Sequence, residues 1–140
     1  MPTVETLLLA NHAEVHRGMV YLMGGGWTIT TRRLRPGAPP PINHFGIAVT
    51  VLVGWGELDT THELAIWIEH EDGGKPLIRA NNRFRAGRPD TLPPGSDQRH
   101  VIAIGIDTQF PGPGGYRVVA EVGESRSTYA FRVVDRVDGA

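Results

Sequence analysis

The segment IAVTVLVGW, residues 47–55, has a β-branched residue or a tryptophan at every second position. Alternate side chains of a strand point to opposite faces of its sheet, so this period of two is typical of a strand with one face in a core. Other alternating runs, separated by turns rich in Gly and Pro, follow at roughly the 8–12-residue spacing of sandwiches and barrels. The pattern predicts an all-β fold.

Alternating and apolar runs together predict eight or nine strands, and no segment has a convincing helical period. They lie at residues 4–10, 19–23, 27–32, 45–55, 63–70, 77–85, 100–106, 116–122 and 128–134. So many strands cannot share one open sheet with a dry face, so we expect a single-domain antiparallel β-sandwich over residues 1–140. A closed β-barrel is the alternative. The nearly all-apolar run 100–106 predicts a strand buried on both faces, and Gly18 predicts a tight hairpin turn at residues 16–18.

The composition excludes several classes of protein. The chain has no Cys and a formal net charge of -1. The absence of Cys excludes disulfides, thiol catalysis and Cys-ligated metal sites, and it fits a reducing compartment. The near-neutral charge gives no field toward nucleic acid or an anionic membrane, and the apolar stretch 7–10 is too short for a signal peptide or a membrane span. We therefore expect a cytoplasmic protein that binds neither nucleic acid nor membrane.

Motifs for catalysis and cofactor binding are missing. No Ser lies in a Gly-x-Ser-x-Gly elbow, and the glycines at residues 24–26 lack the Lys and the helix of a phosphate-binding loop. These glycines instead predict a bulge or a close approach of another backbone. The sequence therefore predicts no cofactor and assigns no catalytic residue, which favours a protein that is not an enzyme.

The segment HAEVH, residues 12–16, is the one place where two histidines lie close together in the sequence, with an acidic residue between them. On a strand, His12, Glu14 and His16 share one face, spaced about 6.5–7 Å apart. The cluster predicts either a solvated polar face or, with a further ligand, a metal site on His12 and His16. That further ligand would come from one of three other histidines: His44, His62 or His70.

A row of arginines is the main candidate binding site. Arg79, Arg83 and Arg85 share one face of a predicted strand, and Arg88 follows in the next loop. Guanidinium groups bind carboxylates and phosphates in bidentate fashion, so the row predicts a contact with an acidic protein or a small anionic ligand. The competing interpretation is a solvated edge strand whose charges discourage edge-to-edge pairing. Three further arginines would join the row if their strand lay beside it: Arg32, Arg33 and Arg35.

Trp67 lies with Ala65 on the less apolar face of its predicted strand, opposite Ile66 and Ile68. An outward tryptophan suits a subunit interface or a sugar-binding platform, and packing between two sheets is the other interpretation. Of the two binding roles, we favour a contact between subunits.

Three parts of the chain carry a resemblance to a known family. They are the strand, hairpin and Gly-Gly-Trp segments at residues 8–15 and 18–27, the Gly-Arg-Pro loop at residues 86–89 with LPPGS at 92–96, and PGGY at residues 113–116. Together they resemble a family of small bacterial proteins that is a domain of unknown function, over nearly the whole chain. Members open on a similar Leu-Ala-Asp strand, where this chain has Asn11. The resemblance implies a stand-alone bacterial domain and brings no activity, cofactor or catalytic residue with it.

The sequence as a whole favours a non-catalytic binding or interaction module that forms a homodimer or a larger oligomer. An alternative from another class is a metal-dependent enzyme that uses His12 and His16. A carbohydrate-binding module with an exposed tryptophan is the third interpretation.

Overall fold

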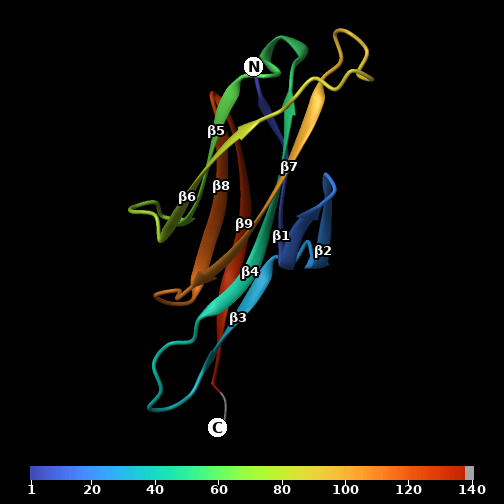
Figure 1. Cartoon of the computed structure of the whole chain (residues 1–140). Helices are drawn as coiled ribbons and strands as arrows, with labels where there is room; N and C mark the ends of the chain where they lie inside the picture. The colour runs from blue at the N-terminus through green and yellow to red at the C-terminus, as the bar shows by residue number, and fades with distance from the viewer. Residues whose placement is uncertain (138–140) are drawn as a thin grey trace.

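A computed structural model of the chain describes residues 1–137. Over these residues the protein has nine strands, one three-residue 3-10 helix and no α-helix, so the all-β prediction is confirmed (Figure 1). The strands are β1 (Thr3–His16), β2 (Met19–Gly25), β3 (Ile29–Leu34), β4 (Asn43–Val53), β5 (Thr61–His70), β6 (Ile78–Arg85), β7 (Gln98–Thr108), β8 (Gly114–Val122) and β9 (Ser125–Val137). The short helix η1 (Trp55–Glu57) follows β4.

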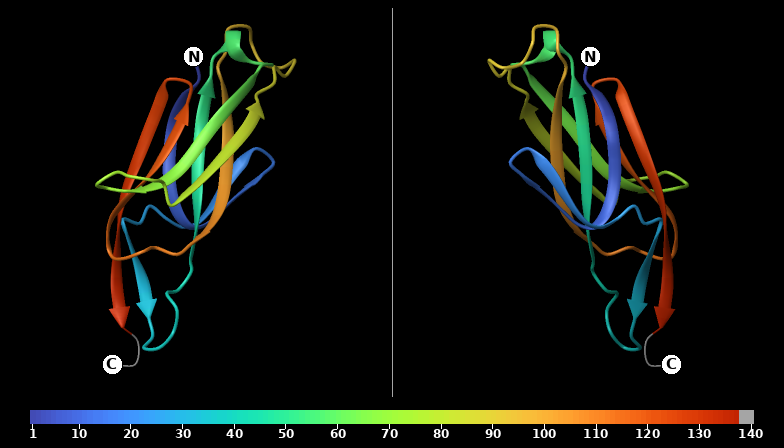
Figure 2. Two further views of the ribbon diagram at one scale, coloured as in Figure 1. Left: turned by 90° about the vertical axis from the view of Figure 1, so that its left-hand side faces the viewer. Right: turned by 90° about the vertical axis from the view of Figure 1, so that its right-hand side faces the viewer.

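The nine strands form two sheets that pack face to face (Figures 1 and 2). Sheet A has the order β2-β1-β4-β7, and sheet B has the order β3-β9-β8-β5-β6. Neither sheet closes on itself, so the structure is the predicted sandwich and not a closed barrel. One pair departs from the antiparallel arrangement: β3, which the chain reaches by crossing from sheet A to the edge of sheet B, runs parallel to β9.

The core lies between the two sheets. It is built from inward-facing side chains, which occupy every second position of their strands. On β4, Ile47, Val49, Val51 and Val53 are each 0% exposed, so the alternation that predicts this strand does mark the core face. Sheet B contributes Leu64, Ile66, Ile68, Val118, Ala120, Val122, Phe131 and Val133. One end of the core is aromatic, with ring centroids 4.9–6.3 Å apart among Phe45, Phe110, Tyr116 and Phe131.

Strand β1 separates from β4 halfway along its length. Its first half pairs with β4 and its second half with β2, and the two registers meet at Ala10. Beyond this point the β1–β2 hairpin crosses the outer face of sheet A (Figure 2), where a Cβ on Gly46 would lie 2.5 Å from the backbone nitrogen of Ala13. The hairpin turns at Arg17 and Gly18, whose φ angles of 53° and 73° confirm the tight turn predicted at residues 16–18 and make it a two-residue turn.

Strand β7 differs from the prediction of a strand buried on both faces. It lies at the edge of sheet A, with Ile102 and Ile106 buried on the inner face and Gly105 exposed on the outer face. The apolar residues of its outer face have a local cause, because β1 and β2 both contact β7 where the hairpin crosses the sheet. A covered edge strand therefore has the same apolar sequence as a central one.

Contacts on both flanks join the two sheets. On one flank, the backbone N–H of Val4 in β1 donates to Oγ of Ser125 in β9 over 2.9 Å. On the other flank, the imidazole of His100 in β7 stacks on the ring of Phe84 in β6, with ring centroids 4.5 Å apart. Burial lowers the pKa of His100, because the protonated imidazole loses water there.

Acidification is expected to destabilise the wild-type protein more than a His100→Leu variant. The pKa of His100 is low in the folded protein and returns to about 6.5 on unfolding, so the unfolded state binds the proton first as the pH falls. The resulting loss of stability develops as the pH falls from about 7.5 to about 5.5, and it is small because the ring is only half-buried and water screens its charge. Urea unfolding of both proteins at the two pH values measures the difference, and equal losses would contradict the assignment.

Candidate interaction surface

The arginine row lies on β6, which is an edge strand of sheet B. Arg79, Arg83 and Arg85 are exposed on its outer face, as their spacing predicts, and Arg83 forms an ion pair with Glu63 at 3.2 Å. Arg88 is set apart in the following loop, where its guanidinium lies 4.6 Å from the ring centroid of Trp55 and donates to the backbone carbonyl of that residue.

The condition for extending the row to the other arginines is not met. Arg32 and Arg33 lie on β3, at the opposite edge of sheet B, with β9, β8 and β5 between. Arg32 is also buried, and its guanidinium donates to the carboxylate of Asp135 at 2.8 and 3.0 Å and to the backbone carbonyl of Phe110 at 2.8 Å. The structure therefore keeps the two groups of arginines separate.

Trp67 lies on the outer face of sheet B but is covered by other side chains. The indole is only 8% exposed, because the guanidinium groups of Arg79 and Arg126 lie 4.9 and 5.3 Å from its ring centroid. Its Nε1 donates to the carboxylate of Glu69 over 2.7 Å, and the same carboxylate accepts from Arg117 over 2.9 Å. These two hydrogen bonds hold the pKa of Glu69 below its ordinary value. Trp67 is thus the centre of a polar network and offers no open ring face to a sugar.

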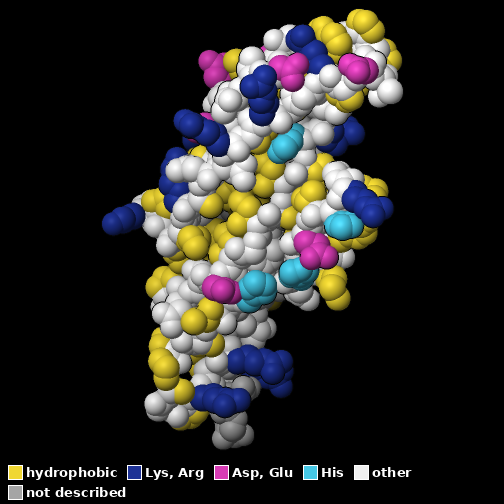
Figure 3. Space-filling view, viewed as in Figure 1, with side chains coloured by type: hydrophobic (Ala, Val, Ile, Leu, Met, Phe, Trp, Pro, Cys, Tyr) yellow, Lys and Arg dark blue, Asp and Glu magenta, His cyan; other side chains and the backbone are white. Residues whose placement is uncertain are grey.

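The histidine cluster lies on the outer face of the β1–β2 hairpin. His12 Nε2 is 3.5 Å from the carboxylate of Glu14, and the His12 ring stacks on His44 with ring centroids 6.5 Å apart. His16, at the end of β1, instead lies beside Tyr21, with ring centroids 6.4 Å apart. Within residues 1–137, no group of three or more His, Cys, Asp or Glu side chains has an arrangement that could hold a metal ion. Figure 3 shows histidine and acidic side chains gathered over this part of the surface.

The same face of the hairpin exposes large apolar side chains that sequence reasoning missed. Met19, Tyr21 and Met23 of β2 are 54%, 46% and 68% exposed, and they lie opposite His16, Glu14 and His12 of β1. The sequence feature that could have revealed them is the segment MVYLM. It is apolar at every position and so matches neither a half-buried strand nor a solvated one. The hairpin therefore has apolar residues where a solvated surface strand would have polar ones.

The edges of the two sheets differ in their protection. Four strands lie at the ends of the sheets, and three carry charged residues: the arginine row on β6, Arg32 and Arg33 on β3, and Arg99 and Asp107 on β7. Strand β2 reads MVYLMGG and has neither a charged residue nor a proline. Charges and prolines prevent an edge strand from pairing with another chain. Among residues 1–137, β2 is therefore the one terminal strand of a sheet without that protection.

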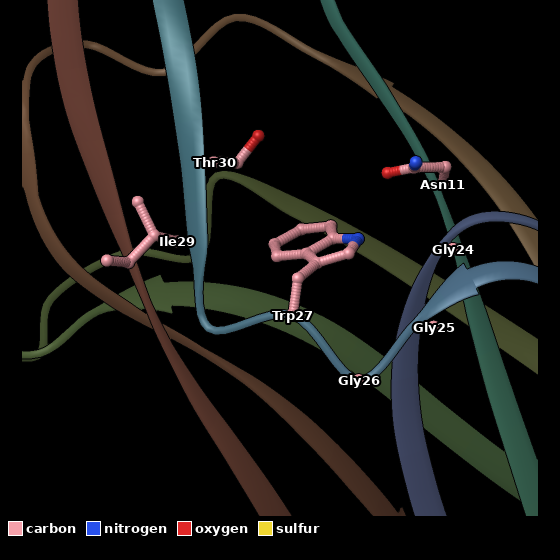
Figure 4. A pocket seen from close by; sticks show the side chains of 7 residues that line it. All are labelled: Asn11, Gly24, Gly25, Gly26, Trp27, Ile29 and Thr30. Atoms are coloured by element: carbon pink, nitrogen blue, oxygen red, sulfur yellow. The ribbon is translucent and has the colours of Figure 1, made fainter.

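A shallow pocket lies at the base of the hairpin (Figure 4). It has a volume of about 430 Å³ and an uncharged lining of Asn11, Gly24, Gly25, Gly26, Trp27, Ile29 and Thr30. A Cβ on Gly24 would lie 2.5 Å from Nδ2 of Asn11, so the close neighbour at this glycine is a side chain and not the second backbone that the run of glycines predicts. The indole of Trp27 packs edge-on against Phe45 and Phe131, and its Nε1 is buried with no hydrogen-bond partner among the described residues.

Fold and surface together define an all-β sandwich with one unprotected edge strand on a hairpin that crosses a sheet. The chain belongs to a family of unknown function, DUF6941, which matches residues 5–134. This confirms the resemblance to an uncharacterised domain family that the sequence indicates. No curated protein matches the chain. No helix within residues 1–137 is long and apolar enough to cross a membrane.

Proposed function

We propose that this protein is a non-catalytic interaction module that self-associates by strand pairing at the free edge of β2. The observation that carries the proposal is the contrast between β2 and the other three edge strands, since only β2 combines exposed apolar side chains with no charge over its length. An edge of this kind is a template for adding another strand, in which main-chain hydrogen bonds supply affinity and side chains supply specificity.

The arginine row is assigned the opposite role in this proposal. Arg83 is neutralised by Glu63, and Arg79 covers the indole of Trp67, so neither guanidinium is free of partners within its own sheet. The charges of β6 keep that edge from pairing, which is the second of the two interpretations of the row. We place the protein in the bacterial cytoplasm, which its Cys-free sequence and its family resemblance support.

A Met23→Lys variant tests the proposal. Met23 is 68% exposed, and the matched control Ile42→Lys changes a residue that is 66% exposed in the loop before β4. We expect Met23→Lys to raise the dissociation constant of self-association at least about tenfold, because a buried ammonium in an apolar strand pair lacks a partner. The control should leave the constant unchanged. Sedimentation velocity over about 1–100 µM protein gives both values. A wild-type protein that is monomeric over this range would refute the proposal.

A further inference from the structure

We infer that two copies of the chain pair antiparallel through β2 about a two-fold axis at Tyr21, so that two copies of sheet A become one continuous sheet. This inference rests on the proposed function and adds the partner, the register and the symmetry. It follows from the order of residues along β2 and from the two faces that β2 presents.

The apolar residues of β2 are symmetric about Tyr21. In an antiparallel pair centred there, Met19 faces Met23 of the second copy, and Val20 faces Leu22 of the second copy. Each residue and its partner then lie on the same face, because the exposed Met19, Tyr21 and Met23 alternate with the half-buried Val20 and Leu22. A two-fold interface requires this self-complementarity, in which every contact occurs twice.

Neighbouring registers lose these contacts. A slip of one residue places the exposed face of one hairpin beside the covered face of the other, since side chains alternate with a period of two. A slip of two residues in one direction sets Met23 against Arg17 of the turn, and in the other direction it sets Val20 against Gly24. The register centred on Tyr21 is the one that pairs all five apolar residues with one another.

Charge permits a second copy of the chain to pair at β2 and opposes the same pairing at β6. Two identical β2 strands bring no like charges together, whereas two β6 strands would oppose rows of arginines. The hairpin lies across the sheet at an angle, and its turn projects beyond the other strands, which leaves the free edge of β2 accessible (Figure 2).

An interface confined to one strand belongs to the small class, below about 1,200 Å² in total, so we expect a dimer that dissociates on dilution.

Single cysteines test the register directly, because the chain has none of its own. Directly opposed residues of an antiparallel pair have Cα atoms about 4.5–5.5 Å apart, within the disulfide range. Oxidised Tyr21→Cys should therefore form a covalent dimer on a non-reducing gel. Met19→Cys alone should not, because the two copies of residue 19 lie about 13 Å apart along the strand. A mixture of Met19→Cys and Met23→Cys should cross-link, and Ile42→Cys reports random collision.

The outcomes separate the register from self-association. One outcome would overturn the register and leave the proposed function standing. In it, the cysteine variants dimerise in sedimentation under reducing conditions, but on oxidation they cross-link no better at residue 21 than at residue 42. A wild-type protein that stays monomeric, with no cross-link at any position, would overturn both.

A second test leaves Tyr21 unchanged, so it still works if Tyr21→Cys disturbs the hairpin. It introduces charges at residues 19 and 23. In the double variant Met19→Lys/Met23→Glu, each Lys faces a Glu of the second copy, whereas in Met19→Lys/Met23→Lys each Lys faces a Lys. We expect the first variant to dimerise at least about tenfold more tightly than the second, with the difference reduced at high salt. Equal dissociation constants for the two variants would contradict the register.

Discussion

Replacing Gly46 with alanine is expected to lower the free energy of unfolding by about 1–3 kcal/mol, the range for inserting a carbon into a filled site. The added Cβ would lie 2.5 Å from the backbone nitrogen of Ala13 and 2.8 Å from its Cβ. Backbone cannot rotate out of the way as a flexible side chain can, so β1 must move away from β4. The hairpin would then lose its position on the outer face of sheet A.

Gly105→Ala is the matched control for this prediction. Gly105 is the direct partner of Gly46 across the β4–β7 pair, and the nearest atom to its added Cβ is His44 Cε1 at 3.7 Å, an ordinary contact. Removing a glycine there also reduces the freedom of the unfolded chain, so we expect no loss of stability and a gain of up to about 1 kcal/mol. Urea unfolding of the two variants measures the difference. Equal stability of Gly46→Ala and Gly105→Ala would show that the hairpin does not rest on β4.

The Gly46 variant also links stability to association. A hairpin displaced from sheet A no longer holds β2 at a fixed angle, so Gly46→Ala should weaken self-association as well, while Gly105→Ala should not. Limited trypsin digestion gives an independent measure, because Arg17 lies in the hairpin turn and its cleavage rate reports local opening.

The fold was predictable wherever a strand has one buried face and one exposed face. The alternation on β4 marks the core side correctly, and on β9 the same period of two buries Phe131 and Val133. The tight turn was predictable from Gly18, because a glycine readily adopts the positive φ that a short hairpin requires. These features depend on neighbours within a few residues, which a single sequence displays.

Features that depend on distant segments were not predictable. The sequence of β7 has the same apolar character as a central strand, and only the path of β1 beyond Ala10 shows that a hairpin covers an edge strand. The parallel β3–β9 pair likewise joins segments about a hundred residues apart along the chain, which no local pattern records.

The candidate site shows the same division between features set by nearby residues and features set by distant segments. The shared face of His12, Glu14 and His16 and the arginine row of β6 both follow from a period of two. By contrast, Arg126 covers Trp67 from a different part of the chain, so the burial of that indole was invisible to periodicity. The unprotected edge of β2 was missed for a further reason: its uncharged sequence becomes significant only once β2 is known to end a sheet.

Replacing Ile47 with alanine is expected to be the most damaging of these substitutions, lowering the free energy of unfolding by about 2–5 kcal/mol. Ile47 is 0% exposed, and on the inner face of sheet A it lies between Leu9 of β1 and Ile104 of β7. Removing three carbons there leaves a cavity that strands held by hydrogen bonds on both sides cannot close. The loss is a large fraction of the about 5–15 kcal/mol by which such proteins are stable.

Ile42→Ala provides a control with identical chemistry at a residue that is 66% exposed, and it should change stability by no more than about 0.5 kcal/mol. Ile47→Val should fall between them, at about 0.5–1.5 kcal/mol, because it removes one methyl group from the same site. Chemical unfolding of the three variants tests this order. Equal effects of the two alanine substitutions would contradict the packing of the sandwich, since residue 47 then could not face sheet B. The predicted order instead means that the buried residues of the segment 47–53, and not its exposed ones, stabilise the fold.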